Sequence, residues 1–437
     1  MTECNQEFVE FPSCKRRKVE ANFEGGAVTS DGGALLLRQA DRRLGLTAAV
    51  AAVLADDRRQ ASCSHDVCSM LRQRVYGLAL GYEDVNDHQT LRADPALQTA
   101  VDRDDVLASS PTICRWENRA NRQTAVEIHR VLIDQFIASH RRPPHEVILD
   151  FDATDDAVHG AQEGRFFHGY YDEYCFLPLY VFCGDQVLVS YLRPSREDPA
   201  RHVWAILSLL VKRIRQAWPQ VKIVFRSDSQ LCRWRMLRWC ERHDVGYIGG
   251  LAKNPRLKAL AEPLIAAAQA RYAATEEKQR VFGEVRYAAA TWDRERRVLV
   301  KAEHLAQGSN PRFVVTNLDG DAQTLYEDVY CARGEMENRI KEQQIDLFAD
   351  RTSCHRWWPN QFRLLLSSLA YTLIEGIRRL ALDGTELARA QCGTIRLKLF
   401  KIGAVIVSNT RRVRFLLSSS YPYRNLFCRV AARLSPG

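Results

Sequence analysis

Residues 146–154 have the sequence Glu146-Val-Ile-Leu-Asp150-Phe-Asp152-Ala-Thr154. Apolar side chains alternate along this stretch, which follows the pair Pro143-Pro144, so we expect a strand that begins just after a domain boundary. Because side chains alternate between the two faces of a strand, Asp150 and Asp152 share a face with Ile148. A carboxylate on an apolar strand is costly unless it is paired or binds a metal ion. The stretch therefore predicts a sheet with acidic side chains on one strand.

The segments that follow predict the rest of this sheet. The turn pair Gly184-Asp185 joins two apolar segments into a hairpin. The predicted elements are strands at 176–183 and 186–192, a helix at 199–218, a strand at 221–225, a helix at 229–243 and a strand at 246–250. Three strands with a hairpin, followed by helix, strand, helix and strand, are typical of the mixed sheet of a ribonuclease-H-like (RNase H-like) core, so we expect an α/β fold.

The remaining segments predict additions to this core. Short apolar runs favour strands at 280–288, 297–302 and 312–316, which we interpret as a β-rich insertion. Longer runs predict helices at 34–44, 48–54, 67–80, 325–346 and 362–382. We divide the chain into a mostly helical DNA-binding region (1–145), the first part of the core (146–252), the β-rich insertion (253–320), the last part of the core (321–382) and a basic C-terminal region (383–437).

The charge of the chain favours a polyanionic partner. Lys and Arg number 62 against 53 Asp and Glu, a net charge of +9. Residues 387–437 contain ten Lys or Arg and no acid. Such a segment attracts phosphate, although a basic tail can also be only a solvated surface. From this region we expect Arg411, Arg412 and Arg414 to contact DNA.

The sequence contains no segment typical of a membrane protein. No stretch approaches 18 uninterrupted apolar residues, so we expect no membrane span. The first residues lack the charged start and apolar run of a secretory signal. The 13 cysteines form no framework, which favours reduced thiols and a location in the cytoplasm.

A second DNA-binding segment is predicted near residue 110. Ser109-Ser-Pro111-Thr favours the start of a helix, because Ser caps a helix well and Pro suits its first position. Arg115 and Arg119 follow on this helix, whose polar face could enter a DNA groove. The alternative is a surface helix that buries Trp116.

Two further acidic positions complete a set with the first strand. Asp228 follows the strand at 221–225, and carboxyl ends of strands are where ligands gather in α/β sheets. Glu337 lies on the helix at 325–346. The side chains that share its helical face, at spacings of three and four residues, are Tyr330, Arg333 and Lys341.

Three clustered carboxylates repel one another unless cations neutralise them. Two Mg²⁺ ions would do so and support phosphoryl transfer, with Arg333 and Lys341 binding DNA phosphates. The alternative is that these acids form salt bridges at the surface.

The spacing Tyr330-x2-Arg333-x3-Glu337 resembles the signature helix of insertion-sequence transposases with an Asp-Asp-Glu (DDE) triad. Other strings resemble the group numbered thirteen-eighty over nearly the whole chain. These strings begin at Phe23 (Phe-Glu-Gly-Gly-Ala-Val-Thr-Ser-Asp-Gly-Gly), Leu149 (Leu-Asp-Phe-Asp-Ala-Thr-Asp-Asp), Gly164 (Gly-Arg-Phe-Phe-His-Gly-Tyr-Tyr) and Asp350 (Asp-Arg-Thr-Ser-Cys-His).

The resemblance implies that Asp152, Asp228 and Glu337 are the catalytic, metal-binding triad. Two Mg²⁺ ions are implied, with Mn²⁺ able to substitute. For the first carboxylate, Asp150 remains the alternative to Asp152. In the related branch a Lys lies seven residues past the Glu, whereas this chain has Gln344 there and a Lys at 341. The role of Lys341 therefore stays open.

The resemblance also implies the reaction and its partners. We expect cut-and-paste transposition, in which the enzyme cuts double-stranded DNA at terminal inverted repeats, with or without hairpin ends, and joins it to target DNA. A homodimer is expected on paired ends, associated with a bacterial nucleoid. Trp292, in the predicted insertion, is a candidate for stacking on a flipped base; the alternative is a packed or surface Trp.

Two other functions remain open from the residues alone. One is an RNase H-like nuclease that only hydrolyses DNA. The other is a DNA-binding protein derived from a transposase that no longer cuts. Strand joining of a pre-cut end separates the first from a transposase, and Mg²⁺-dependent cleavage separates the second.

Overall fold

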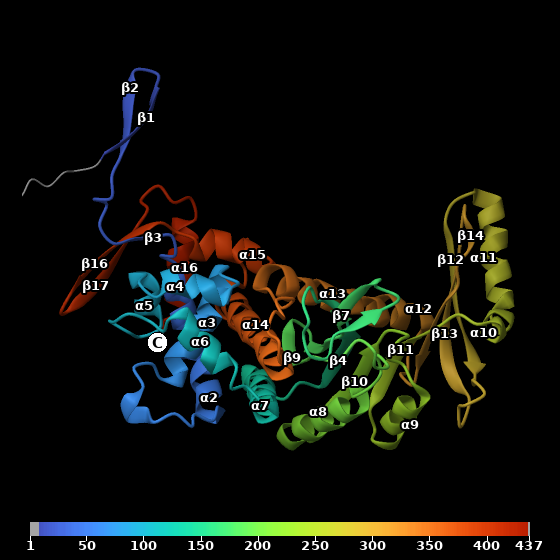
Figure 1. The fold of residues 1–437 in the computed structure, drawn as a ribbon. Coiled ribbons are helices and arrows are strands. Elements are labelled where there is room, and N and C mark those ends of the chain that lie inside the picture. The colour runs from blue at the N-terminus through green and yellow to red at the C-terminus, as the bar shows by residue number, and fades with distance from the viewer. Residues whose placement is uncertain (1–7, 436–437) are drawn as a thin grey trace, which may run out of the picture. The chain divides into compact units, whose positions relative to one another are not determined.

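A computed structural model describes residues 8–435 of the chain. These residues form two compact units (Figure 1). One contains residues 48–55 and 115–375, and the other contains residues 8–47, 56–114 and 376–435. The N-terminal and C-terminal segments, which the sequence analysis treated as separate regions, therefore fold into one unit.

The first unit is built on a nine-stranded mixed sheet. Its path is β12-β13-β15-β11-β10-β4-β8-β9, with β14 paired to β13. The parallel pairs are β4 with β10 and β10 with β11, and all other pairs are antiparallel. The strands are β4 (Glu146–Ala153), β8 (Leu179–Cys183), β9 (Gln186–Tyr191), β10 (Lys222–Ser227), β11 (Gly246–Leu251), β12 (Gln279–Tyr287), β13 (Arg296–Leu305), β14 (Gly308–Ser309) and β15 (Arg312–Thr316).

The two faces of this sheet pack against different helices. Val147, Leu149 and Phe151 belong to one core cluster with α7 (Arg122–Ser139), α8 (Val203–Ala217) and α9 (Trp234–Arg242). Ile148 packs on the other face against the segment that follows β15. The elements of that segment are α12 (Ala322–Thr324), the helical turns η3 (Leu325–Tyr330) and η4 (Cys331–Arg333), α13 (Gly334–Lys341), η5 (Glu342–Asp346) and α14 (Trp357–Ile377). The alternation predicted for residues 146–152 is therefore confirmed.

The segment predicted as a β-rich insertion differs from expectation in two ways. It begins with two helices that the sequence analysis did not predict, α10 (Pro255–Leu260) and α11 (Glu262–Thr275). Its strands do not form a separate sheet, because β15 pairs antiparallel with β11 and extends the central sheet. The signal for α10 was present in the sequence, since Asn254 caps the helix and Pro255 occupies its first turn.

A small sheet emerges from the end of β4. It contains β5 (Asp156–Ala157), β6 (Phe166–His168) and β7 (Glu173–Phe176) in the order β5-β7-β6. The single strand predicted at 176–183 is in fact two strands, β7 and β8. Pro178 lies between them, and proline is confined to the ends and edges of strands. This excursion leaves the central sheet after Ala153 and returns to it at Leu179.

The second unit combines helices from both ends of the chain. Gly32 and Gly33 donate backbone hydrogen bonds to Ile402 (2.8 Å) and Phe400 (3.0 Å). A Cβ on Gly33 would lie 1.9 Å from the Leu399 carbonyl oxygen, so only glycine fits. The helices are α1 (Ala34–Leu44), η1 (Gln60–Ser62), α3 (Val67–Leu80), η2 (Val85–Asp87), α4 (His88–Leu91), α5 (Pro95–Ala100), η6 (Arg378–Leu382), α15 (Cys392–Ile395), η7 (Arg396–Phe400) and α16 (Arg424–Leu434). Three helices continue from one unit into the other: α2 (Leu46–Val53), α6 (Ser110–Glu117) and α14.

Two small sheets belong to this second unit. β3 (Val28–Thr29), β16 (Ala404–Asn409) and β17 (Arg412–Leu417) form one, in the order β17-β16-β3. β1 (Val9–Cys14) and β2 (Arg17–Ala21) form an exposed two-stranded ribbon (Figure 1). The N-terminal region expected to be mostly helical thus also contains strands. Within residues 8–435 no helix is long and apolar enough to cross a membrane.

Candidate active site

Two of the predicted carboxylates lie at the same edge of the central sheet. Asp152 is near the carboxyl end of β4, and Asp228 directly follows β10. The two strands are parallel, with Ser227 opposite Phe151, so Asp228 is level with Asp152. Neighbouring strands are about 4.8 Å apart. The topology therefore brings two carboxylates that are 76 residues apart in sequence next to one another.

Arg333 connects the first carboxylate to the third. Its Nη1 donates to Asp152 Oδ2 at 3.0 Å, and its Nη2 donates to Glu337 Oε1 at 2.6 Å. Arg333 and Glu337 are four residues apart, so the predicted shared helical face is observed for this pair. Tyr330 and Arg333 precede α13, because the helix predicted at 325–346 is divided into turns of different width. Lys341, at the end of α13, is exposed.

The surroundings of Asp152 raise the pKa of its carboxyl group. It is raised to about 6, first by burial, against the opposing effect of Arg333, and further by the negative charges of Asp228 and Glu337. The Asp152 side chain is 14% exposed and that of Glu337 is 46% exposed. Asp152 is thus largely buried, Glu337 is partly exposed to solvent, and the charges of Asp228 and Glu337 both act on Asp152.

Asp228 is fixed by the start of the next connection. Its Oδ1 accepts backbone hydrogen bonds from Gln230 (2.9 Å) and Leu231 (3.1 Å). This turn leads from β10 toward α9. Two backbone N–H groups therefore orient the carboxylate, and its second oxygen has no hydrogen bond within residues 8–435 and remains available to a ligand.

Asp150, the alternative first carboxylate, has a different partner. It is buried, and its Oδ2 accepts from Arg226 Nη2 at 2.7 Å, with a further contact from Arg226 Nε. The two residues lie opposite one another in the β4–β10 register. Arg226 also donates to the Val329 carbonyl, in the segment before α13. Asp150 therefore forms an internal ion pair, and Asp152 is the carboxylate that Arg333 and Glu337 approach.

Gly250 in β11 is a site residue that the sequence analysis missed. A Cβ at this position would lie 2.7 Å from the Tyr330 hydroxyl and 2.9 Å from the Ser229 backbone nitrogen. The glycine therefore permits Tyr330 and the turn that holds Asp228 to pack against β11. Its neighbour Gly249 is also tightly enclosed, by Cys232. The pair Gly249-Gly250 inside a predicted strand was a signal of such close approach.

The side chains at this sheet edge are of the types that bind divalent cations. Within residues 8–435 no group of three His, Cys, Asp or Glu side chains is arranged closely enough to hold a metal ion. Arg333 lies between Asp152 and Glu337, where its positive charge balances theirs. Carboxylate oxygens are the donors that Mg²⁺ and Mn²⁺ prefer. The residue types therefore fit a hard divalent cation, and Arg333 is the group with which such a cation competes.

Trp292 lies in a different part of the sheet. It is partly buried, packs edge-on against Tyr287 with ring centroids 5.4 Å apart, and lies under the Arg296 guanidinium. Trp292 precedes β13, near whose start Arg297 pairs with Thr316 of β15. Thr316 in turn pairs with Ile248, so this end of β13 lies toward the amino end of β11. Asp228 lies at the other, carboxyl edge. These contacts favour the packed alternative for Trp292.

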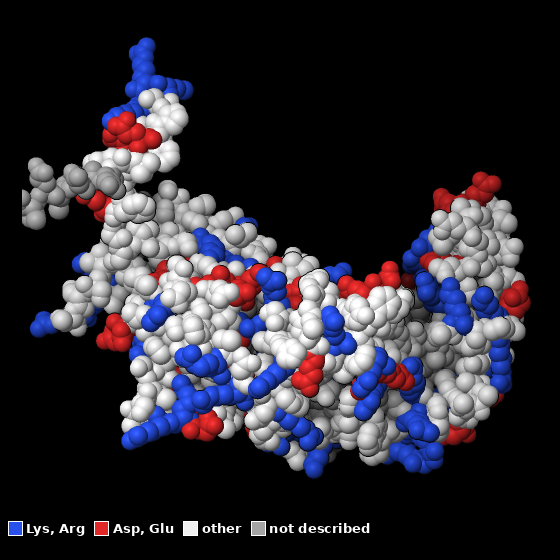
Figure 2. All heavy atoms as spheres, in the orientation of Figure 1, with Lys and Arg blue, Asp and Glu red and all other residues white. Residues whose placement is uncertain are grey.

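The other predicted DNA-contacting residues lie on exposed surfaces. Arg115 is on α6, but Arg119 follows that helix, which ends at Glu117, and Trp116 is buried. Arg411, Arg412 and Arg414 are exposed at the tip of the β16–β17 hairpin. One basic group was missed by the sequence analysis. It lies at the end of the β1–β2 ribbon, where Figure 2 shows Lys and Arg atoms, and consists of Lys15, Arg16, Arg17 and Lys18.

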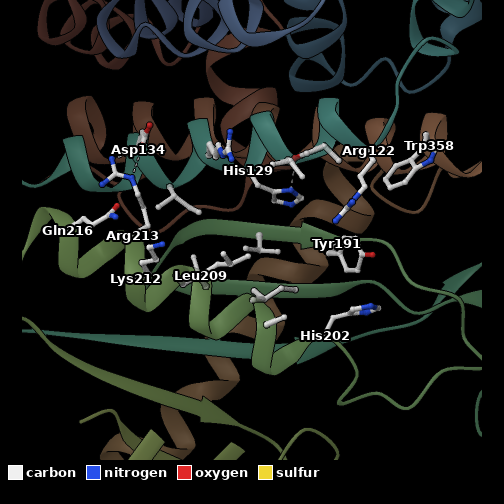
Figure 3. Close-up of a pocket in the computed structure, with 18 residues that line it drawn as sticks. Arg122, His129, Asp134, Tyr191, His202, Leu209, Lys212, Arg213, Gln216 and Trp358 are labelled. Carbon is white, nitrogen blue, oxygen red and sulfur yellow. Dashed lines mark hydrogen bonds and ion pairs between the residues drawn. The ribbon is translucent and has the colours of Figure 1, made fainter. Parts of the chain in front are cut away.

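A cavity of about 700 Å³ lies elsewhere in the same unit. Side chains of α7, α8 and β9 line it, among them His129, Leu209 and Lys212 (Figure 3). None of the three carboxylates lines it, and α7 and α8 cover the opposite face of the sheet from Asp152. A smaller cavity of about 380 Å³ lies beside the turn that holds Asp228, where Ser229, Gly250 and Tyr330 are among the residues that line it.

Comparison with known proteins identifies the family. The family model described as "Transposase DDE domain group 1" matches residues 11–436. No curated protein matches the chain. A solved structure, the "piggyBac transposase synaptic complex with hairpin DNA", is similar with a TM-score of 0.42 and 10% identity, covering 90% of this chain and 81% of that one. The family match spans nearly the whole sequence, and the chain belongs to the DDE transposases, enzymes of DNA transposition that use divalent metal ions.

Proposed function

We propose that this transposase cuts DNA at transposon ends and joins it to a target with Asp152, Asp228 and Glu337 as ligands of two Mg²⁺ ions. The observation that supports this most strongly is that Asp152 lies level with Asp228 and shares Arg333 with Glu337. β4 and β10 end side by side, and Arg333 connects Asp152 to Glu337 of α13. Mn²⁺ would substitute for Mg²⁺, because the same oxygen ligands suit both.

We further propose that the core is RNase H-like. In the central sheet, the first three strands along the chain are β4, β8 and β9, and they pair in this order as antiparallel neighbours. β10 and β11 continue the sheet in parallel on the other side of β4. This order matches the one expected from the sequence.

Each acid has a distinct part in the proposed site. When bound, the cations would activate the attacking water or 3′-hydroxyl and stabilise the leaving oxygen. Asp152 supplies a carboxylate from a largely buried position, and Asp228 one that two backbone N–H groups orient. Glu337 supplies the third from the exposed face of α13. Such fixed positions hold the reacting groups in line, which is the larger part of catalysis of phosphoryl transfer.

The proposed substrate is double-stranded DNA with terminal inverted repeats, and target DNA. Arg333, Tyr330 and Lys341 lie along the segment that carries Glu337, where they would bind phosphates beside the cut. Arg115, Arg119 and the arginines of the β16–β17 hairpin are proposed contacts farther along the duplex. A homodimer on paired ends follows from the need to hold two ends together, and light scattering of the DNA complex tests it.

The test is cleavage of DNA that carries the element's own terminal repeats. Glu337→Gln, Asp152→Asn and Asp228→Asn each remove one charge and should lower Mg²⁺-dependent cleavage by more than the roughly 10- to 100-fold lost when a residue that only supports a metal ligand is replaced. Glu335→Gln is the matched control, because Glu335 lies on the same helix and is 73% exposed. Equal cleavage by the Glu335 and Glu337 variants would refute the proposal. Joining of a pre-cut end to a target plasmid distinguishes a transposase from a nuclease that only hydrolyses.

A further inference from the structure

The β6–β7 hairpin exposes three large aromatic side chains. Phe167, Tyr170 and Tyr174 are 53%, 79% and 49% exposed. Phe167 lies directly opposite Tyr174 in the register, with ring centroids 5.7 Å apart, and Tyr170 lies in the turn between the strands. Exposed aromatic side chains that lie together are characteristic of a binding surface, because contact with a ligand removes their apolar area from water.

Arg165 lies against one of these rings, and Arg196 lies against the neighbouring Phe166, whose side chain points to the other face of β6. The Arg165 guanidinium lies 4.8 Å from the Tyr174 ring centroid, and that of Arg196 lies 4.3 Å from the Phe166 ring centroid. Arg196 is exposed. A guanidinium that stacks on a ring through its face keeps its N–H groups at the edge, where they can donate to phosphate. Aromatic rings with basic neighbours are the composition of surfaces that bind unpaired nucleic acid.

The hairpin lies beside the proposed catalytic carboxylates. It belongs to the excursion that leaves the central sheet just after Asp152 and returns opposite it, at Tyr180 and Leu179. The pKa of Tyr171 is raised to about 12, first by burial and then by nearby charges that include Asp152. Tyr171 contacts Tyr170 edge-on, with ring centroids 5.0 Å apart. Tyr170, the most exposed of the three aromatic residues, therefore contacts Tyr171, on which the charge of Asp152 acts.

We propose that Phe167, Tyr170 and Tyr174 form a stacking platform for unpaired bases of the DNA strand next to the bond that is cut. This inference rests on the proposed function. The faces of bases are inaccessible inside a duplex, so an aromatic platform binds nucleotides that are frayed or flipped out of the stack. Trp292 is less suited to this role, because it is partly buried and contacts Tyr287 and Arg296.

The experiment compares two DNA probes that differ only in pairing. Both carry the terminal repeat, one fully paired and one with two mismatched nucleotides at the cut site, including 2-aminopurine, whose fluorescence falls on stacking. Tyr170→Ala should weaken binding of the mismatched probe by about 5- to 150-fold, the range expected for loss of stacking on one base. It should leave binding of the paired probe within twofold. Tyr170→Trp should restore binding and quenching.

The matched control is Trp204→Ala, which removes an aromatic ring that is 54% exposed on α8. This variant should bind both probes as the native protein does. The proposal is overturned if Tyr170→Ala binds the mismatched probe normally, or if it weakens both probes equally. It is also overturned if the variant changes the oligomeric state and leaves DNA binding intact, because the surface is then a protein interface.

Binding is measured in the Glu337→Gln background, so the result does not depend on cleavage. If Glu337→Gln still cuts DNA, the proposed function fails while the stacking result stands on its own. If Glu337→Gln is inactive and Tyr170→Ala binds both probes normally, only the platform fails.

Discussion

Arg333 and a divalent cation compete for the same two carboxylates. Arg333→Ala removes hydrogen bonds to Asp152 and Glu337 and leaves the largely buried Asp152 without a charged partner. Without Mg²⁺ the free energy of unfolding should fall by about 1–3 kcal/mol. Added Mg²⁺ should then raise the Tm of the variant more than that of the native protein. Thermal unfolding without Mg²⁺ and with Mg²⁺ at about 100 times its Kd measures both effects. An equal Mg²⁺ shift in the two proteins would mean that the cation does not replace the guanidinium.

Because Gly250 packs tightly against the site, replacing it by alanine should lower activity although no carboxylate is changed. Gly250→Ala places a methyl group 2.7 Å from the Tyr330 hydroxyl and 2.9 Å from the Ser229 nitrogen. Tyr330 can rotate away, but the backbone beside Asp228 must shift. Cleavage should fall by about 10- to 100-fold, because small displacements of reacting groups are costly. Gly334→Ala is the control, since its Cβ meets nothing within 4 Å. Cleavage equal to that of the control would show that this contact does not position Asp228.

At the residue scale, the sequence predicted the shared face of two acids but not their separate roles. Alternation along β4 correctly placed Asp150 and Asp152 with Ile148. Which acid binds an internal partner depends on Arg226, which lies opposite Asp150 only once β10 pairs with β4. The same limit applies to Trp292, whose neighbours become known only from the sheet register.

At the element scale, strands were predicted better than the connections between them. β4, β9, β11 and β15 lie within one or two residues of their predicted bounds. The helix predicted at 325–346 is divided, because its spacing of apolar residues does not reveal where turns widen. α10 and α11 were missed, although the Asn254-Pro255 pair is the type of start signal that was used at Ser110-Pro111.

The β1–β2 ribbon makes a prediction that belongs to this scale. A two-stranded ribbon is marginally stable alone and can enter the major groove of DNA. Arg16 and Arg17 are exposed at its tip, whereas Lys18 is paired with Glu10 and Glu20. Replacing both arginines by Ala should reduce the slope of log affinity against log salt by about two, because each arginine neutralises one phosphate. The control changes Arg141 and Arg142, also exposed, to Ala. Equal slopes for the two double variants would exclude the ribbon as a DNA-binding element.

At the scale of the whole molecule, the chain ends fold together in a way that the sequence pattern did not indicate. Gly32-Gly33 predicted a break before the first helix, which is present as α1. The same glycines also admit residues 399–402 from the other end of the chain. Contacts over such a separation produce no local periodicity, so the basic C-terminal region was expected to be a separate segment.

Gly33→Ala tests this shared unit. Its Cβ would overlap the Leu399 carbonyl and the Phe400 backbone, and neither can rotate away. The cost should be about 1–3 kcal/mol or more, as for other overpacked sites. Hydrogen exchange should rise in α1, α3 and η7 while β4 and β10 remain protected, because each unit has its own core. Gly403→Ala, whose Cβ meets nothing within 4 Å, should leave exchange unchanged. Uniform destabilisation of both units would contradict the division.

The most direct test of a shared metal site at Asp152, Asp228 and Glu337 is cleavage of the protein backbone by hydroxyl radicals that bound Fe²⁺ generates from added hydrogen peroxide, with ascorbate to regenerate Fe²⁺. Iron replaces Mg²⁺ and cuts peptide bonds near its ligands, and mass spectrometry locates the cuts. We predict cuts in the end of β4, in the turn after β10 and in α13, all suppressed by excess Mg²⁺ and lost in Asp152→Asn. Cuts confined to one of these segments, or placed elsewhere in the chain, would contradict the account.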